Sequence, residues 1–262
     1  EYKLGQRGEP DLLAVSLTSH DIIGHAFGPN SQEIEEITVR EDQVVSELLN
    51  YIKSKVPGGL ADVTVVLTAD HGVAPTPEWL KEHHGPGVRI DDDALTAALE
   101  NGLVKKFGSA KGGKWVSSAV DMRYYLNGAG GAPIEALEEE GKRILRDQPA
   151  VLFAISRADY EQRHLPGGII ERQFLKTYQI GRSGDLIAIP KPFAITGSDT
   201  TTHFTGFSYD RTVPVVLYGS SFKPGRYSQR AEVVDIAPTL TYILNVLPPA
   251  LSEGRVLTEA LK

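Results

Sequence analysis

Near the start of this chain, an amphipathic helical stretch lies between two short apolar runs, and this order constrains the fold more than any other feature. The two runs, Asp11–Leu17 (DLLAVSL) and Val63–Thr68 (VTVVLT), have the length and composition of buried strands. Residues 31–55 carry apolar side chains at helical spacing, with charged residues between them. This order predicts a βαβ unit, and therefore an α/β fold with a mostly parallel central sheet.

The middle of the chain differs from its two ends in the pattern of its residues. Prolines at positions 75, 77, 190 and 192 bracket a stretch with many glycine turns. We expect an inserted α/β subdomain over residues 76–190, between a first core part (1–75) and a second core part (191–262). The patterns predict helices near 92–101, 133–146 and 234–244, and strands near 116–120, 151–155 and 213–218.

The absence of cysteine limits the chemistry that the chain can perform. With 0 Cys there is no disulfide, thiolate ligand or cysteine nucleophile, so a transition-metal site would need histidine and carboxylate ligands. The formal net charge of -7 argues against general nucleic-acid binding, which needs basic patches. No apolar run approaches the roughly 20 residues that span a bilayer, so we expect no membrane partner.

Three polar segments border the predicted core strands, and each offers ligands of the kind that zinc prefers. Asp21 and His25 follow the first apolar run and are four residues apart, a spacing that places both on one face of a helical turn. Asp70 and His71 directly follow the second run, at the edge where α/β sheets usually bind ligands. His203 lies in a polar loop shortly before the strand predicted over 213–218.

Each of these segments alone has little predictive value, whereas their combination is specific. An Asp-x-x-x-His pair or a lone histidine is usually an ordinary solvated group, but three such clusters beside core strands favour a metal site. Of the remaining histidines, His20 lies beside the first cluster, but adjacent residues on a helical turn diverge, whereas His83, His84 and His164 have no partner pattern. We expect them to be non-ligands, with His83 and His84 at the surface.

At these motifs the sequence resembles the alkaline phosphatase superfamily, and most closely the bacterial monoesterases related to type I phosphodiesterases and nucleotide pyrophosphatases. The matching motifs, in chain order, are D-x-x-G-H-x-x-G-P (Asp21–Pro29), T-A-D-H-G (Thr68–Gly72), T-T-H (Thr201–His203), Y-D-x-x-V-P (Tyr209–Pro214) and D-I-A-P-T (Asp235–Thr239). Both ends of the chain match well, and the middle matches loosely. The resemblance implies an alkaline-phosphatase-like α/β/α sandwich, present in part, with the insert.

The resemblance also implies a zinc-dependent hydrolase of phosphate monoesters that works through a phosphoryl-enzyme. Asp21, His25 and His203 would bind the first of two zinc ions. Asp70 and His71 would bind the second, together with an Asp from an earlier strand. The family's Thr or Ser nucleophile precedes the first motif, and no residue of this chain matches it. We therefore expect the C-terminal part of such an enzyme, with one complete zinc site and no catalytic nucleophile.

Several alternatives stay open at this point. A phosphodiesterase or nucleotide pyrophosphatase, a sulfatase and a cofactor-independent phosphoglycerate mutase share these motifs in part. An alternative of another class is a catalytically inactive metal-binding fragment, and the simplest is a soluble α/β domain with chance His and Asp clusters. By resemblance, we expect a small phosphate ester as partner and a periplasmic or extracellular parent protein. The acidic net charge leads us to expect no nucleic-acid partner.

Overall fold

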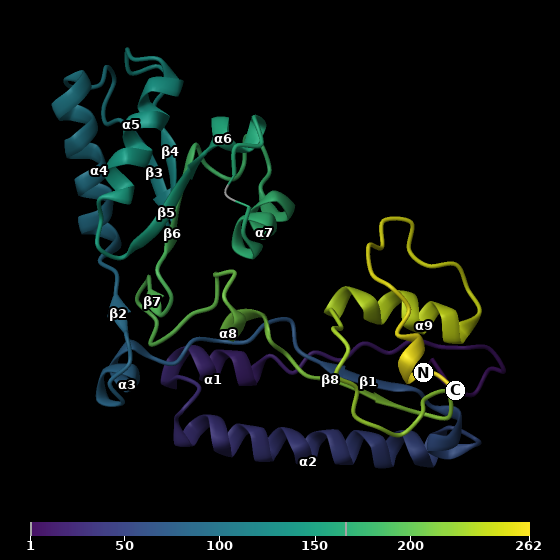
Figure 1. Ribbon diagram of the computed structural model, residues 1–262. Helices are drawn as coiled ribbons and strands as arrows, with labels where there is room; N and C mark the ends of the chain where they lie inside the picture. Colours follow the sequence, from purple (N-terminus) through teal and green to yellow (C-terminus); the bar gives the residue numbers. More distant parts are fainter. Residues whose placement is uncertain (1, 166) are drawn as a thin grey trace. The chain divides into compact units, whose positions relative to one another are not determined.

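A four-stranded antiparallel sheet with helices on both faces forms the largest core in the computed structural model of the chain, which describes residues 2–165 and 167–262 (Figure 1). All three strand pairs within this sheet are antiparallel. In spatial order the strands are β3 (Val116–Val120), β4 (Arg123–Leu126), β6 (Leu186–Pro190) and β5 (Val151–Ser156).

Strand β6 shows why both faces of this sheet are covered. Leu186 and Ala188 belong to one hydrophobic cluster, whereas Ile187 and Ile189 belong to another. Side chains along a strand point alternately to opposite faces, so an unbroken apolar run needs cover on both sides. Helices α4 and α5 contribute to the first cluster, and α6 and α7 contribute to the second. Their bounds are α4 (Asp92–Phe107), α5 (Ile134–Arg146), α6 (Arg157–Glu161) and α7 (Ile169–Thr177).

The chain separates into two compact units. The first comprises the residues up to His20 together with Glu35–Gly72 and Thr212–Lys262, and the second comprises Asp21–Ile34 and Val73–Arg211. The four-stranded sheet and the whole of the expected insert lie in the second unit. The three-part division expected from the sequence stays a prediction.

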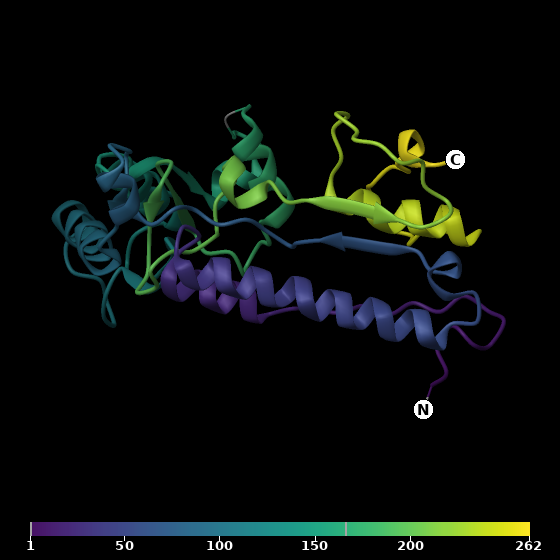
Figure 2. The same ribbon diagram turned by 90° about the horizontal axis from the view of Figure 1, so that it is seen from below.

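The first unit contains a two-stranded antiparallel ribbon. Strand β1 (Val65–Thr68) pairs with β8 (Val215–Tyr218), with Thr68 opposite Val215, and the two strands lie side by side in both ribbon views (Figure 1 and Figure 2). The other helical elements that lie wholly or mostly in this unit are α2 (Gln32–Lys55), η1 (Gly59–Asp62), η2 (Val233–Asp235), α9 (Ile236–Leu244) and η3 (Thr258–Ala260).

Short elements of the second unit position the candidate site. Strand β2 pairs with β7 in parallel, with Arg89 opposite Ile195. Thr76 caps the helix that precedes β2, because its side chain accepts a hydrogen bond from the Trp79 amide. These elements, with the helix that carries the first motif, are α1 (Ser19–Phe27), α3 (Pro77–Glu82), β2 (Val88–Arg89), β7 (Ala194–Ile195) and α8 (Ser208–Arg211).

Most of the predicted elements are confirmed, and one is wrong. The helices predicted over 31–55, 92–101, 133–146 and 234–244 correspond to α2, α4, α5 and α9, and the strands over 63–68, 116–120, 151–155 and 213–218 correspond to β1, β3, β5 and β8. The strand predicted over Asp11–Leu17 is not formed. A strand needs a hydrogen-bonded neighbour, and no described strand pairs with this segment. None of the described helices combines the length and apolar character needed to cross a membrane.

Candidate metal centre

Helix α1 presents the first two candidate ligands. Asp21 and His25 lie one turn apart on it, with 3.5 Å between Oδ1 of Asp21 and Nε2 of His25. Gly28 ends the helix: its φ of 84° suits glycine, and its amide donates to the Gly24 carbonyl at 2.8 Å. A Cβ at position 28 would lie 2.4 Å from Cγ2 of Thr76, so the glycine of this motif also makes room for its neighbour.

The loop that carries His203 is fastened to the end of α1 by backbone hydrogen bonds. The amides of Thr200 and Thr201 donate to the His25 carbonyl at 3.1 and 3.4 Å. The Thr200 hydroxyl donates to the Ala26 carbonyl at 2.7 Å. Carbonyls in the last turn of a helix have no partner within the helix, so the threonines satisfy groups that would otherwise need water. The same bonds bring His203 to the helix.

Among the residues that the structure describes, Asp21, His25 and His203 are the one group of three whose ligand atoms lie within 4.8 Å of one another. The Nε2 atoms of the two histidines are 3.1 Å apart, and Nε2 of His203 lies 3.7 Å from Oδ1 of Asp21. Tetrahedral ligands about 2.0–2.1 Å from a zinc ion lie roughly 3.3–3.4 Å from each other. The observed separations bracket this value, so the donor set fits zinc.

The ring of His25 is held in the tautomer that a metal requires. Its Nδ1 lies 2.8 Å from the carbonyl oxygen of Thr201. A carbonyl can only accept, so Nδ1 donates, and in the neutral ring this leaves the lone pair on Nε2. Metal-binding histidines are commonly oriented by such a bond from the second ring nitrogen. Thr201 itself is fully buried, and its hydroxyl donates to the Ala74 carbonyl at 2.7 Å.

The site is partly open to solvent. The side chains of His25 and His203 are 23% and 17% exposed, while that of Asp21 is 43% exposed. A group bound on the Asp21 side can therefore be reached from water. This is the property that separates catalytic zinc sites, which keep an open position, from closed structural ones.

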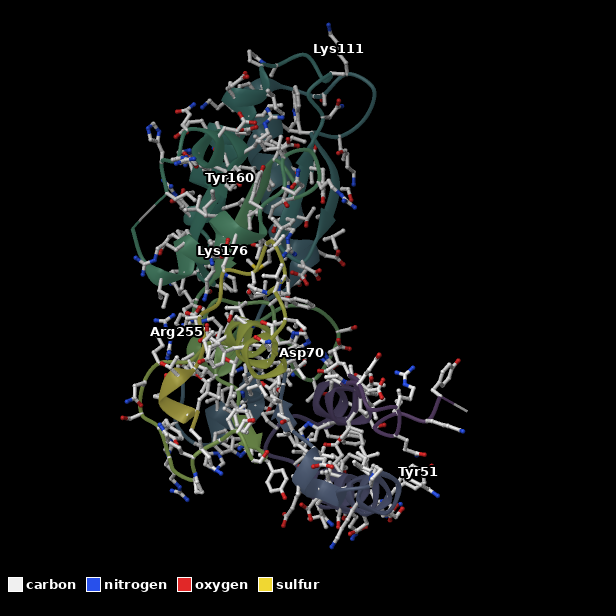
Figure 3. The ribbon with its side chains drawn as sticks, turned by 90° about the vertical axis from the view of Figure 1, so that its right-hand side faces the viewer. Tyr51, Asp70, Lys111, Tyr160, Lys176 and Arg255 are labelled. Carbon is white, nitrogen blue, oxygen red and sulfur yellow. The ribbon has the colours of Figure 1, made fainter. Side chains whose placement is uncertain are left out.

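Asp70 and His71 lie in the first unit, directly after β1. Nδ1 of His71 lies 3.0 Å from the Gly72 carbonyl, so it donates there, and Nε2 lies 3.7 Å from Oδ2 of Asp70. The Asp70 side chain is 89% exposed (labelled in Figure 3). The pair thus repeats the histidine orientation of the first site with two candidate ligands, and its role as a second zinc site stays a prediction.

Two residues that hold the candidate site in place were not predicted from the sequence. Thr201 belongs to the T-T-H motif, but its carbonyl accepts a hydrogen bond from His25, which lies 176 residues away in the chain. Asp210 is buried, and its Oδ2 accepts from the amide and the hydroxyl of Thr205, which fixes the far side of the His203 loop. The Y-D pair of the fourth motif was the available signal for it. His83 and His84 are exposed, as expected.

Comparison with known proteins identifies what the chain is similar to. Residues 2–210 match the sequence model of the family described as type I phosphodiesterase / nucleotide pyrophosphatase. A protein of Myroides odoratus named calcium-transporting ATPase is 31% identical over 256 residues, which cover 96% of this chain and 46% of that protein. Alkaline phosphatase PafA of Elizabethkingia meningoseptica is 29% identical over 258 residues, covering 96% and 46% respectively.

The crystal structure of wild-type alkaline phosphatase PafA has the same fold. It superposes with a TM-score of 0.83 at 27% sequence identity, covering 94% of this chain and 47% of that chain. The expected alkaline-phosphatase-like α/β fold is therefore confirmed. The chain spans about half the length of the curated relatives it matches.

Proposed function

Because the chain belongs to the type I phosphodiesterase / nucleotide pyrophosphatase family, we propose that it supplies a zinc-binding part of an enzyme that hydrolyses phosphate esters. Similarity to an alkaline phosphatase over 96% of the chain supports ester hydrolysis. The observation that carries the zinc assignment is the convergence of Asp21, His25 and His203 at tetrahedral spacing. Bound there, zinc would supply the positive charge that an anionic phosphate oxygen needs.

The residues of the chain divide the work at this site. Asp21 brings a carboxylate that offsets part of the cation's charge and leaves one side accessible. The bond from His25 Nδ1 to the Thr201 carbonyl holds the ring so that Nε2 can coordinate. The same loop carries His203, so the fastening of Thr200 and Thr201 to α1 fixes two of the three ligands together. Preorganisation of this kind lowers the cost of binding a metal.

We further propose that the nucleophile comes from outside these 262 residues. Thr200 and Thr201 lie three and two residues before His203, and their hydroxyls donate to the carbonyls of Ala26 and Ala74, which suits a structural role. The chain also spans only 46% of the relatives it matches. Asp70 and His71 would hold a second zinc, completed by a further ligand from elsewhere in the protein.

Phosphomonoesters are the proposed substrates, because the relatives compared over nearly the whole chain include an alkaline phosphatase. The description of the family favours diesters as the second candidate. We propose a periplasmic or extracellular location and a small phosphate ester as the substrate, both on the ground of family resemblance.

Binding of inorganic phosphate to the zinc-loaded chain tests this proposal. Isothermal titration should show phosphate binding that requires zinc and is lost with the metal in His203→Ala. Phenyl phosphate should compete with phosphate more strongly than diphenyl phosphate or sulfate if monoesters are the substrates, and the reverse order would favour diesters. Phosphate binding unaffected by zinc would refute the proposed role of the site. Robust turnover of an ester by the chain alone would refute the external nucleophile.

A further inference from the structure

Arg89 joins three segments of the second unit through one guanidinium group. Its Nη1 donates to the carbonyl of Asp199 at 2.8 Å, and its Nη2 donates to the carbonyl of Thr200 at 2.7 Å. The same group pairs with both carboxylate oxygens of Glu78, at 3.0 Å from Nε and 2.8 Å from Nη2. All these residues belong to the second unit, and none is a candidate metal ligand.

These contacts differ from those of an ordinary surface ion pair. An exposed pair of Arg and Glu side chains contributes little, because water and salt screen it. Here the Arg89 side chain is 34% exposed, and half of its contacts go to backbone carbonyls of a loop without regular structure. Such carbonyls have no ladder partner, so a charged donor decides where the loop backbone lies.

The loop positions that Arg89 holds lead directly to the metal ligands. Thr201 is the next residue, and its carbonyl accepts a hydrogen bond from His25, with 2.8 Å between Nδ1 and the oxygen. His203 follows two residues later. A shift of the backbone at Asp199 and Thr200 would therefore move the acceptor that orients His25 and the segment that carries His203.

Arg89 is itself held in place, its backbone by strand β2 and its side chain by Glu78. Its backbone lies in β2, where the next amide, that of Ile90, donates to the Ile195 carbonyl at 2.8 Å. Glu78 lies in the first turn of α3, a helix capped by Thr76. The hydrogen bonds from Arg89 hold the pKa of Glu78 below its ordinary value, so the carboxylate stays ionised and keeps the guanidinium oriented.

We propose that Arg89 is a positioning residue of the zinc centre: by fixing the Asp199 and Thr200 carbonyls, it holds the Thr201 carbonyl where it orients His25 and brings His203 into register. Glu78 orients the guanidinium fork for this task. This inference rests on the proposed zinc site and adds a residue from a different part of the chain to it.

Zinc affinity of the full 262-residue chain tests the proposal without any activity assay. The dissociation constant, measured by competition with a chromophoric chelator, should rise about 10- to 100-fold in Arg89→Ala, the range typical for losing a residue that orients metal ligands. In Arg89→Lys the dissociation constant should rise less than in the alanine variant but should stay above that of wild type, because a single ammonium cannot reproduce the planar guanidinium fork. The cobalt(II) absorption spectrum should change in Arg89→Ala, since it reports ligand geometry.

Arg255 provides a matched control in the first unit (labelled in Figure 3). Its guanidinium also pairs with a glutamate, Glu259, and donates to two backbone carbonyls, those of Arg230 and Val256. Arg255→Ala removes a comparable set of bonds from a segment without candidate ligands, so its zinc affinity and cobalt spectrum should equal those of wild type.

The possible outcomes separate this inference from the proposed function. If wild type binds no zinc, the zinc site itself is refuted. If wild type binds zinc and Arg89→Ala binds it equally well, only the role of Arg89 is refuted. Equal losses in Arg89→Ala and Arg255→Ala would also refute it, because they would reflect general destabilisation. Should Arg89→Ala fail to melt cooperatively, Arg89→Lys and Glu78→Gln decide, and wild-type affinity in both would refute the proposal.

Discussion

His25 illustrates how far residue types alone lead towards a site. Its spacing from Asp21 on a helical turn predicted that both could reach one cation, and the structure places their ligand atoms 3.5 Å apart. The sequence did not reveal the carbonyl that fixes its tautomer, because that acceptor is a backbone atom and carries no side-chain signal. The backbone partners of Arg89 were hidden for the same reason. Candidate ligands can be predicted from residue types, whereas the hydrogen bonds that orient them can be identified only from the folded structure.

Glu140 allows a prediction at the scale of a single titratable group. Its side chain is 8% exposed, and hydrogen bonds from Arg143 and Lys106 hold its pKa at about 2, below the ordinary glutamate value of 4.5. A lowered folded-state pKa stabilises the protein above the unfolded value, and this contribution disappears as the pH falls towards the folded value. Because both cations are about half exposed or more, we expect only about 1 kcal/mol.

Urea unfolding of wild type and Glu140→Gln across pH checks this. The variant should be less stable by about 1 kcal/mol at neutral pH, and the difference should shrink as pH falls below about 4.5 towards 2. Glu139→Gln is the control, because Glu139 is 74% exposed in its pair with Lys142 and should show little difference at any pH. A stability gap for Glu140→Gln that does not change with pH would contradict the assignment.

At the scale of elements, the spacing of apolar residues predicted the helices well, but it did not show whether an apolar run would find a strand to pair with. Helix α5 was expected from its sequence pattern, and its Leu137, Ile144 and Leu145 are buried in the same hydrophobic cluster as Leu186 of β6. The run Asp11–Leu17 looked like a strand by the same kind of reasoning, yet Leu12 and Val15 are 77% and 55% exposed. An apolar run indicates which side chains a segment could bury, but the segment becomes a strand only where a neighbouring strand is available for hydrogen bonding.

Close packing of α5 on the sheet makes Gly141 a sensitive position. A Cβ there would lie 2.3 Å from Cδ1 of Leu186, which is fully buried. Alanine gains about 1 kcal/mol of helix propensity over glycine, but overpacking a core costs about 1–3 kcal/mol. We therefore expect Gly141→Ala to destabilise the chain by about 1 kcal/mol in thermal or urea unfolding.

Gly24 in α1 provides the matched comparison. The nearest atom to a Cβ at this position is Cδ1 of Ile34 at 3.7 Å, an ordinary contact. Gly24→Ala should therefore be neutral or stabilising by up to about 1 kcal/mol. If both alanine variants changed stability in the same direction and by the same amount, local packing would not be the reason.

At the scale of the whole molecule, the candidate ligands divide between two compact units. Asp21, His25 and His203 belong to the second unit, and Asp70 and His71 belong to the first. Chain order predicted a core interrupted by an insert, but not that the first motif would cluster with the insert. That association comes from the bonds between α1 and the His203 loop, which join residues far apart in the chain.

This division predicts a selective effect of zinc on unfolding. The chain has 2 Trp, and both Trp79 and Trp115 lie in the second unit, so tryptophan fluorescence reports that unit. A ligand that binds only the folded state stabilises it by about 2.7 kcal/mol at a concentration of 100 times its dissociation constant. Zinc at that level should raise the fluorescence-detected unfolding midpoint in wild type but not in Asp21→Asn. An equal rise in both would place the bound zinc elsewhere.

The most direct test of the zinc assignment is the metal content of the purified chain after equilibration with zinc and removal of the excess. Elemental analysis should find about one tightly held zinc ion in wild type and in His83→Ala. The His83 ring stacks on Trp79, and His83 does not belong to the group of candidate ligands found among the described residues. His203→Ala should retain little or none. Absence of zinc from wild type, or full retention in His203→Ala, would contradict the account of Asp21, His25 and His203 as a metal centre.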